Sequence, residues 1–358
     1  MSQKPTELLK GRGAQSRQSN RFESLRHEVM AEFLEHCRTD GDLPEVRTTF
    51  VEIHPKTIVN KVTSPDVRMP YSMNPYQGCE HGCVYCYARN THEYWGYGPG
   101  LDFESRILVK PTAPRLLEAF IRRPKWEATP IVLSGNTDCY QPAEKRFRIT
   151  RACLEVFLRY RHPVGIITKN ALVLRDLDLL GELNRHGLVS VHLSVTSLDE
   201  ATRRMLEPRT AATAKRLATI RKLNDAGIPV NAMLAPIIPG INSHELMGLA
   251  AAVAEAGARS FGFTMVRLNG AIGQLFTEWV RKAMPDRAEK VLSQIRACHG
   301  GQLNDSEYGR RMKGEGPIAA QIHQMATLAR KRYFKGRSLP ELNTKLHAEY
   351  KSGQWSLF

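Results

Sequence analysis

The sequence predicts an α/β protein whose core is a partial (β/α)6 barrel with extensions at both ends. Three observations support this prediction. From about residue 105 onward, runs rich in β-branched residues alternate with amphipathic helical stretches. The connections between them are short and marked by Gly or Pro, which favours parallel strands joined by right-handed crossovers. At 358 residues, the chain is long enough to bury one large α/β core with short flanks.

Six strands are predicted from these runs, namely RILVK, PIVLSG, PVGIITK, LVSVHLSV, IPVNAMLAP and SFGFTMVRL. Helical periodicity covers the stretches between them, at residues 114–122, 143–160, 174–185, 211–226 and 243–256. In barrels of this kind, functional residues lie on the loops that follow the carboxyl ends of the strands. Those strand ends are therefore where we expect the functional side chains.

The segments outside this repeat differ in composition. Residues 1 to about 20 are polar and basic, a composition that cannot build a core and predicts disorder in isolation. A helix is predicted at residues 24–37, with one apolar face formed by Val29, Met30, Phe33, Leu34 and Cys37. After about residue 300 the repeat stops and a basic tail follows. We expect three parts: a basic extension with one helix at 1–64, the core domain at 65–300, and a basic tail at 301–358.

The composition limits the classes of function. The chain carries 51 Lys and Arg against 36 Asp and Glu, a formal net charge of +15 with a pI near 9.6. Such an excess is typical of proteins that bind nucleic acid, although a merely basic cytosolic protein has the same composition. No apolar run approaches the roughly 18 to 20 residues that a membrane span needs, and no secretory cleavage pattern is present. The sequence therefore predicts a cytoplasmic protein.

The segment NPYQGCEHGCVYCYAR places Cys79, Cys83 and Cys86 in a Cys-x3-Cys-x2-Cys motif. Three soft thiolates in a short glycine-containing loop suit an iron-sulfur cluster. Because three ligands serve four irons, one iron stays open to a chelating substrate. The alternative is structural zinc with His81 as the fourth ligand, although typical zinc sites pair two separated knuckles. The seven cysteines are too few and too clustered for a disulfide framework.

With Tyr85 immediately before the third cysteine and six βα repeats downstream, this motif resembles that of the radical-SAM superfamily. The resemblance implies two cofactors, a 4Fe-4S cluster held by the three cysteines and S-adenosylmethionine (SAM). In that superfamily, the amino and carboxylate groups of the methionine chelate the open iron. An electron from an external donor then cleaves the sulfonium to methionine and a 5′-deoxyadenosyl radical, which takes a hydrogen atom from the substrate. The protein supplies placement and excludes water.

Polar residues close three of the predicted strands. The superfamily usually has a Gly-rich segment at the second strand end, whose backbone receives the methionine amino group; here the sequence is SGNTD. Lys169 would pair with the methionine carboxylate, and Ser194 and Thr196 would reach ribose or carboxylate oxygens. A Gly at a strand end is also ordinary turn chemistry, but three polar strand ends at one barrel mouth favour a shared site. The residues expected at the SAM site are Tyr85, Ser134, Gly135, Asn136, Lys169, Ser194 and Thr196.

Within the superfamily, the CYAR, TKN and LSVTSLD segments look most similar to the branch of spore photoproduct lyase and DNA-repair-photolyase-like proteins. The resemblance spans roughly residues 70–270 and extends more closely to an uncharacterised bacterial family with TDxYQP and LEPR segments. In the lyase, a cysteine at the second strand end returns a hydrogen atom to the product. Here Gly135 or Asn136 stands near that place, so thymine-dimer repair itself is not implied. Cys139, a few residues on, is the candidate hydrogen donor; the alternative is an inert loop thiol.

Other residues receive weaker assignments. Cys153 and Cys298 fall on apolar helical faces and are predicted to be core residues. Glu207 and Arg209 follow the fourth strand, where they would line the substrate opening or form a helix-surface ion pair. Three further polar residues stand near the mouth without an assigned geometry: Asp138, Tyr140 and Gln141.

The leading functional hypothesis is a radical-SAM enzyme, lyase-like, that acts on nucleic acid, with DNA favoured. The alternatives are modification of RNA or protein, and a non-catalytic module in which a cluster or zinc stabilises a nucleic-acid-bound scaffold. Nucleic-acid binding is predicted at the basic N-terminal segment and at residues 310–337. At the C-terminus, Gln354, Leu357 and Phe358 resemble the peptide that docks repair proteins onto the bacterial DNA sliding clamp. The alternative is a terminus that packs on its own barrel.

Overall fold

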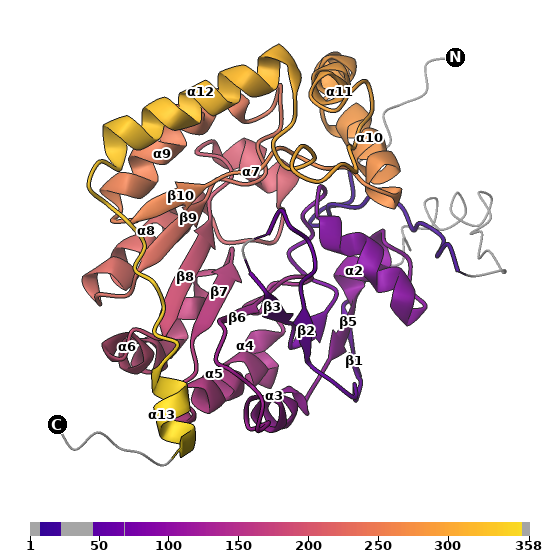
Figure 1. Ribbon diagram of the computed structural model, residues 1–358. Coiled ribbons are helices and arrows are strands. Elements are labelled where there is room, and N and C mark those ends of the chain that lie inside the picture. Colours follow the sequence, from indigo (N-terminus) through magenta and orange to yellow (C-terminus); the bar gives the residue numbers. More distant parts are fainter. Residues whose placement is uncertain (1–7, 23–45, 68, 353–358) are drawn as a thin grey trace.

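The computed structural model describes residues 8–22, 46–67 and 69–352, whose strands form two sheets (Figure 1). The larger sheet has the order β10-β9-β8-β7-β6-β3-β2. All its pairings are parallel except that of the edge strand β2 with β3. Six parallel strands in chain order form the predicted partial barrel, which stays open between β10 and β2 within the described residues. The strands are β2 (Val59–Lys61), β3 (Tyr71–Met73), β6 (Ile131–Leu133), β7 (Val164–Thr168), β8 (Val189–Ser194), β9 (Val230–Met233) and β10 (Ser260–Gly262).

Helices cover the outer face of this sheet (Figure 1). Each turns an apolar face inward, and one continuous core joins these faces to the strands. The predicted helical stretches are confirmed, but residues 143–160 form two helices because Arg148 adopts a left-handed φ of 53°. The covering helices are α3 (Ala113–Ile121), α4 (Glu144–Phe147), α5 (Ile149–Arg159), α6 (Leu177–Arg185), α8 (Thr213–Asp225) and α9 (Leu246–Glu255), with the 3-10 turns η2 (Ala171–Asp176) and η3 (Ser243–Glu245) before α6 and α9.

The first predicted strand, RILVK, is not part of the barrel. It forms β5 (Arg106–Val109), which pairs with β1 (Thr49–Glu52) and β4 (Tyr76–Gln77) in a separate three-stranded sheet. The first barrel strand is instead β3, which precedes the three cysteines in the chain. The prediction was wrong because β3 has only three residues, too few to show a periodic pattern, whereas RILVK is a clear apolar run.

A second core lies beside the barrel, under helices α10 (Ala271–Ala283) and α11 (Ala288–Ala297), which the 3-10 turn η4 (Pro285–Arg287) connects. The buried side chains Phe276 and Trp279 of α10 pack with their ring centroids 5.3 Å apart and their planes tilted by 45°. The same core contains Cys83, Val84 and Tyr85 from the cysteine motif and Leu206 from α7 (Glu200–Leu206). The cysteine motif is therefore packed into an apolar core and is not an isolated surface loop.

The region after residue 300 is not a tail in the part that the structure describes. Helix α12 (Gly316–Tyr333) lies along α9 (Figure 1), and Ala319, Ile322, Ala326 and Ala329 belong to the main core. Helix α13 (Leu346–Ser352) follows, and His347 is buried where its Nδ1 lies 2.7 Å from the carbonyl oxygen of Tyr160. Small alanine side chains let α12 pack closely against the main core. The sequence analysis did not predict this apolar face because the segment is rich in Lys and Arg and its apolar residues are mostly alanines.

Two predictions lie outside the described residues. The helix expected at residues 24–37 is one, and the sliding-clamp peptide with Gln354, Leu357 and Phe358 is the other. Both stay predictions. Among the helices of the described residues, none combines the length and the apolar character needed to cross a membrane.

A substitution in α12 tests whether this helix is part of the core. Ile322 is 3% exposed, whereas Leu328 on the same helix is 55% exposed. Ile322→Ala should lower the free energy of unfolding by about 2 to 5 kcal/mol, because it leaves a cavity in the core. Leu328→Ala should change it by no more than about 0.5 kcal/mol. Urea unfolding of both variants measures the difference, and two equally small effects would show that α12 does not stabilise the barrel.

Candidate active site at the carboxyl ends of the strands

The three cysteines of the motif lie in the loop between β4 and the 3-10 helix η1 (Tyr87–Trp95), here called the cysteine loop (residues 78–86). All three are free thiols, Cys79 and Cys83 each 7% exposed and Cys86 partly exposed. Burial raises the pKa of Cys79, and the nearby Asp138, Cys83 and Cys86 raise it further. Because these thiols would repel one another as thiolates, their ionisation calls for a positively charged group among them. A metal cluster meets that need.

The zinc alternative does not fit this geometry. Across the described residues, no three His, Cys, Asp or Glu side chains are placed to hold a single metal ion. His81, the expected fourth ligand, is buried with Nδ1 3.3 Å from a carboxylate oxygen of Asp138 and Nε2 3.3 Å from Asn170. Both ring nitrogens are thus engaged elsewhere. Three thiols of one short loop suit an iron-sulfur cluster, for which Cys thiolates are the usual ligands.

On one side, the cysteine loop is held by a buried ion pair between Arg89 and Glu104 of α2 (Leu101–Ser105), both 0% exposed. Arg89 is the arginine of the CYAR segment. Its Nε and Nη2 donate to the carbonyl oxygen of Cys83 at 3.0 and 2.9 Å, and its Nη1 donates to the carbonyls of Pro99 and Gly100. A guanidinium with several fixed acceptors holds this backbone rigidly.

The described N-terminal residues 8–22, here called the N-terminal strap, complete this side. The amides of Gly13 and Ala14 donate to the carboxylate of Glu104 at 3.1 and 2.7 Å. The backbone of Gly13 lies so close to the loop that a Cβ there would stand 1.8 Å from the carbonyl oxygen of Gly82. In the folded protein these residues are held by a carboxylate about 90 positions away in the chain. The disorder expected for the isolated segment stays a prediction.

On the opposite side, Tyr85 donates a hydrogen bond to Glu207, which follows α7 and pairs with Arg216 of α8 at 2.5 Å. Glu207 and Arg216 are both 0% exposed. Burial alone would raise the pKa of Glu207, but the cations Arg216 and Lys169 hold it at about 2. Neither predicted role of Glu207 is correct: it lines no opening and forms no surface pair, because it anchors Tyr85 from inside.

Arg209 also contacts the cysteine loop. Its backbone amide donates to the carbonyl oxygen of His81 at 3.2 Å, and its guanidinium lies 3.7 Å from the carboxylate of Glu80. The LEPR segment therefore supports the loop through both a side chain and the backbone. No sequence pattern indicated this, since the two segments lie more than 120 residues apart.

The turn after β6 contains the SGNTD segment and faces the cysteine loop. Asn74, at the end of β3, accepts hydrogen bonds from the amides of Gly135 and Asn136 at 2.8 and 2.9 Å. Ser134 adopts a φ of 79°, and the hydroxyl of Thr137 donates to the carbonyl oxygen of Gly78 at 2.6 Å. The structure thus brings this turn against the cysteine loop, and Asn74 is a site residue that sequence reasoning missed.

Asp138 joins three segments at this edge of the sheet. Its carboxylate accepts hydrogen bonds from the hydroxyl of Thr168 at 2.7 Å and the amide of Lys169 at 2.8 Å, both at the end of β7. It also lies against His81 of the cysteine loop. Burial would raise the pKa of Asp138, but His81 and these hydrogen bonds lower it to about 2. Asp138 therefore fixes the relative positions of two strand ends and the loop.

The two remaining strand ends also meet here. Burial lowers the pKa of Lys169, but the nearby Cys83 and Glu207 more than compensate, so its net pKa is raised. Ser194 is buried, and its carbonyl oxygen accepts from Arg216 at 3.1 Å. The hydroxyl of Thr196 is buried without a hydrogen-bond partner in the described residues. The ammonium of Lys169 beside the cysteine loop and this unpaired hydroxyl fit a ligand with carboxylate and hydroxyl groups.

Cys139 does not lie at the mouth. It is 0% exposed within the main core, with its Sγ 3.9 Å from the carbonyl oxygen of Ile167, and burial raises its pKa. This burial fits the alternative of an inert thiol in the turn between β6 and α4, which directs the side chain inward, and does not support the hydrogen-donor role. Cys153 and Cys298 are buried in the core, as predicted.

Tyr87 is an aromatic side chain that contacts the SGNTD turn. Its hydroxyl donates a hydrogen bond to the carbonyl oxygen of Gly135, although the side chain is 53% exposed. It extends from Cys86 across the opening toward the SGNTD turn. The sequence analysis did not assign Tyr87 to the site, although it is the tyrosine of the CYAR segment.

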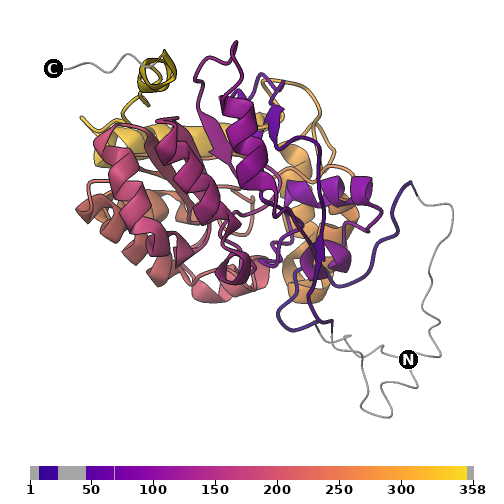
Figure 2. The same cartoon turned by 90° about the horizontal axis from the view of Figure 1, so that it is seen from below.

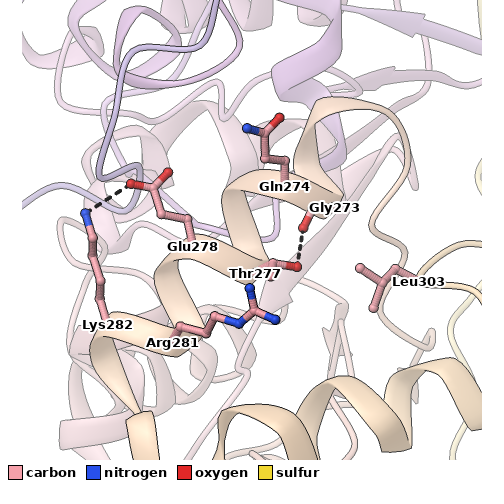
Figure 3. A pocket seen from close by; sticks show the side chains of 7 residues that line it. All are labelled: Gly273, Gln274, Thr277, Glu278, Arg281, Lys282 and Leu303. Atoms are coloured by element: carbon pink, nitrogen blue, oxygen red, sulfur yellow. Dashed lines mark hydrogen bonds and ion pairs between the residues drawn. The ribbon is translucent and has the colours of Figure 1, made fainter.

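A surface groove lies on the outer side of α10, away from these strand ends (Figure 3). Residues of α10 and Leu303 line it, and its polar side chains pair among themselves, as Lys282 does with Glu278 at 3.0 Å. The hydroxyl of Ser16 in the N-terminal strap also donates to Glu278 at 2.7 Å. No side chain of the cysteine loop lines this groove, so it takes no part in the site.

Comparison with known proteins identifies the family. Residues 73–253 match the model of the radical SAM superfamily. The chain belongs to the radical SAM superfamily. The cofactors of this superfamily are a 4Fe-4S cluster and SAM, which the three-thiol loop and the polar strand ends fit.

The proteins similar in sequence are described as uncharacterised. An uncharacterised protein of Mycobacterium tuberculosis strain H37Rv is 34% identical over 66% of this chain and 71% of its own length. An uncharacterised protein of Methanocaldococcus jannaschii is 31% identical over 53% of this chain and 68% of its own. The family is therefore shown by sequence, but the relatives do not name a substrate.

Among solved structures, the fold is similar to that of spore photoproduct lyase. The lyase complexed with its dinucleoside spore photoproduct has a TM-score of 0.61 at 18% identity, with 81% of each chain covered. A mutant lyase with bound AdoMet and the dinucleoside has a TM-score of 0.60 at 17% identity, covering 88% of this chain and 86% of that one. At this identity, the likeness shows a shared fold alone.

Removing Glu207 tests the support of the cysteine loop. Glu207→Ala should lower the free energy of unfolding by about 3 to 5 kcal/mol, because Arg216 would be left as a buried, unpaired charge. The matched control is Glu289→Ala, since Glu289 is 68% exposed and its pair with Arg281 should contribute no more than about 1 kcal/mol. Urea unfolding at neutral pH compares them, and equal losses would contradict a supporting role for Glu207.

The depressed pKa of Glu207 also predicts a pH dependence. Its native pKa of about 2 lies below the unfolded value, so its contribution is complete above about pH 5 and is lost as the pH falls toward 2. The stability difference between the wild type and Glu207→Gln should therefore narrow over that range. Urea unfolding at several pH values measures it, and a constant difference would argue against an ionised Glu207.

Proposed function

We propose that this protein is a radical-SAM enzyme in which Cys79, Cys83 and Cys86 hold the cluster, and that it acts on DNA. The observation that carries the first part is the cysteine loop itself: three free thiols fixed by buried ion pairs on both sides, facing the polar strand ends. When bound, the reduced cluster and SAM supply a carbon-centred radical able to take a hydrogen atom from an unactivated position. The protein's residues determine where that chemistry occurs.

Binding of SAM is assigned to the strand ends that converge on the loop. Lys169 provides a cation for the methionine carboxylate, beside Cys83 and Cys86. The SGNTD turn provides backbone groups for the methionine amino group, with Gly135 and Asn136 held in place by Asn74. Ser194 and the unpaired hydroxyl of Thr196 provide contacts to ribose or carboxylate oxygens. Tyr85, which donates a hydrogen bond to Glu207, fixes the cysteine loop beside these strand ends.

DNA is the favoured substrate class for two reasons. The net charge of +15 supplies a field that attracts polyanions. The fold neighbour of similar size and topology binds a dinucleoside lesion, which supports a lyase-like or repair reaction. Since Cys139 lies in the core, the proposal gives it no role as hydrogen donor. Modification of RNA or protein is the second candidate function, favoured by the same basic surface, and a non-catalytic scaffold would bind nucleic acid without cleaving SAM.

The decisive experiment for the substrate is anaerobic incubation of the reconstituted protein with labelled SAM and either intact or damaged DNA, or RNA. Label transferred to DNA, or DNA-dependent formation of 5′-deoxyadenosine, would support the proposal. Label in RNA or in protein would favour the second candidate. The absence of SAM cleavage under every condition would leave only the scaffold.

Loss of any one cysteine of the loop should remove the cluster. Cys79→Ala, Cys83→Ala or Cys86→Ala should abolish the iron and sulfide content and the visible absorbance of anaerobically reconstituted protein, because three thiolates are the minimum ligand set. Cys153→Ala is the matched control, since that thiol is buried in the core far from the loop in sequence and should leave the cluster intact. A colourless wild-type protein that retains stoichiometric zinc would contradict the assignment.

Removing the cation at the end of β7 should weaken SAM binding. Lys169→Ala should raise the dissociation constant for SAM roughly tenfold to a hundredfold, because it loses a charge-assisted contact of about 1.5 to 3 kcal/mol. Ser194→Ala should weaken binding less. The exposed Lys222→Ala on α8 controls for the loss of a positive charge. Calorimetric titration of reconstituted protein with SAM measures these dissociation constants. Unchanged affinity in both Lys169→Ala and Ser194→Ala would show that neither residue binds SAM.

A further inference from the structure

Among the described residues, most of the exposed aromatic side chains lie on the two segments that flank the cysteine loop. Soluble proteins normally bury such rings, and a group of exposed ones indicates a binding surface. Four of them lie on the N-terminal strap or on η1, the helix that leaves the loop, and the fifth lies in the segment between α11 and α12. The five are Phe22, Tyr87, Tyr94, Trp95 and Tyr308, with exposed fractions of 60, 53, 70, 40 and 61%.

Cations accompany the rings at the end of η1. Phe22 and Tyr94 lie with their ring centroids 5.4 Å apart, and the guanidinium of Arg21 stands 4.7 and 5.5 Å from them. Arg21 is 53% exposed and also lies 3.4 Å from Glu93, so it is held in place but still faces solvent. The ammonium of Lys110 stands 5.9 Å from the ring of Trp95. This end combines stacking surfaces with positive charge.

The same combination continues on the other side of Tyr87. Arg311 lies over the ring of Tyr308 at 4.3 Å and pairs with Asp66 at 2.5 Å. Arg267 lies within electrostatic reach of both Arg311 and Tyr87.

Arg267 has few partners for a cation. Its Nε is buried without a hydrogen-bond partner in the described residues, and its Nη1 contacts only the sulfur of Met312, at 3.7 Å. Burial and the neighbouring Arg311 lower the pKa of Arg267 by more than the nearby Asp66 and Asp305 raise it. A guanidinium that lacks an oxygen acceptor is suited to a bound anion such as a phosphate group.

We propose that Phe22, Tyr87, Tyr94, Trp95 and Tyr308, together with Arg21 and Arg267, form a track that binds a single strand of DNA across the cysteine loop. Bases stack on the exposed rings, and the two guanidinium groups contact the phosphates between them. The choice of DNA as the nucleic acid rests on the proposed function. The proposed function names DNA as the substrate. The track specifies that this DNA is single-stranded and names the residues that bring it to Tyr87.

A single strand fits this surface better than a duplex or a protein. Separate rings on a strap, a helix and a loop offer faces to unpaired bases, whereas a duplex buries its base faces and presents phosphates. Two carboxylates beside these rings, Glu93 and Asp66, are paired with Arg21 and Arg311, so their negative charges are offset. An acidic peptide would pair with Arg21 and Arg267 but would offer no planar groups to stack on the aromatic rings.

Fluorescence anisotropy of reconstituted protein with labelled oligo(dT) of about 16 nucleotides tests the track. Tyr94→Ala and Tyr308→Ala should each weaken binding about 5- to 150-fold, since each removes one stacking position. Arg267→Ala should weaken binding and also reduce the dependence of affinity on salt, because one phosphate contact is lost. Leu328→Ala, which removes an equally exposed apolar side chain from α12, should bind as the wild type does. Circular dichroism confirms that each variant is folded.

The outcomes separate the track from the proposed function. Wild-type affinity in both tyrosine variants, or no oligo(dT) binding by a protein that cleaves SAM, would overturn the track and leave the radical-SAM assignment standing. Tighter binding of duplex DNA would overturn the single-stranded form, and tighter binding of oligo(U) would overturn the choice of DNA. A protein that binds oligo(dT) through these rings but cleaves no SAM would overturn the proposed function alone.

Discussion

Two buried ion pairs, Arg89 with Glu104 and Arg216 with Glu207, are the constraint on which the cysteine loop depends. All four side chains are fully buried, so each charge is satisfied only while its partner stays in place. One pair holds the backbone of the loop through the carbonyl of Cys83, and the other holds the side chain of Tyr85. The cysteine loop is thereby held on both sides of its second cysteine, Cys83, and its backbone is fixed independently of a cofactor.

The strand ends extend this arrangement into a binding site. Asp138 ties the end of β7 to the turn after β6 and to His81 in the loop, so three chain segments that meet only in the folded protein share one carboxylate. Lys169 then places its ammonium between the cysteines and Glu207. In a partly desolvated opening, such fixed charges interact strongly with a zwitterionic ligand and need little reorganisation when it binds. This is the setting that a reactive radical requires, because it excludes water.

The N-terminal strap connects the site with the surface around it. Its first half lies against Gly82 and Glu104, and its last residue, Phe22, packs on Tyr94 at the end of η1. In Figure 2 the strap, drawn in indigo, lies at the end of the molecule away from the C-terminal helix α13. One segment thus supports the cysteine loop and contributes to the proposed DNA track. DNA bound to the track would contact the same strap that stabilises the cysteine loop. Substrate binding would therefore help to order the cofactor site.

The sequence by itself determined the family, the alternation of strands and helices, and the cofactors. Local features encode these properties: three cysteines at short spacing, periodic apolar runs, and polar residues such as Lys169 at the strand ends. Only the tertiary structure decided that β3 and not RILVK opens the barrel, that α12 belongs to the core, and that Cys139 points inward. It alone showed that Asn74, Glu104 and Glu207 hold the site. These contacts join residues far apart in the chain, and a buried carboxylate is indistinguishable in sequence from a solvated one until its partner is known.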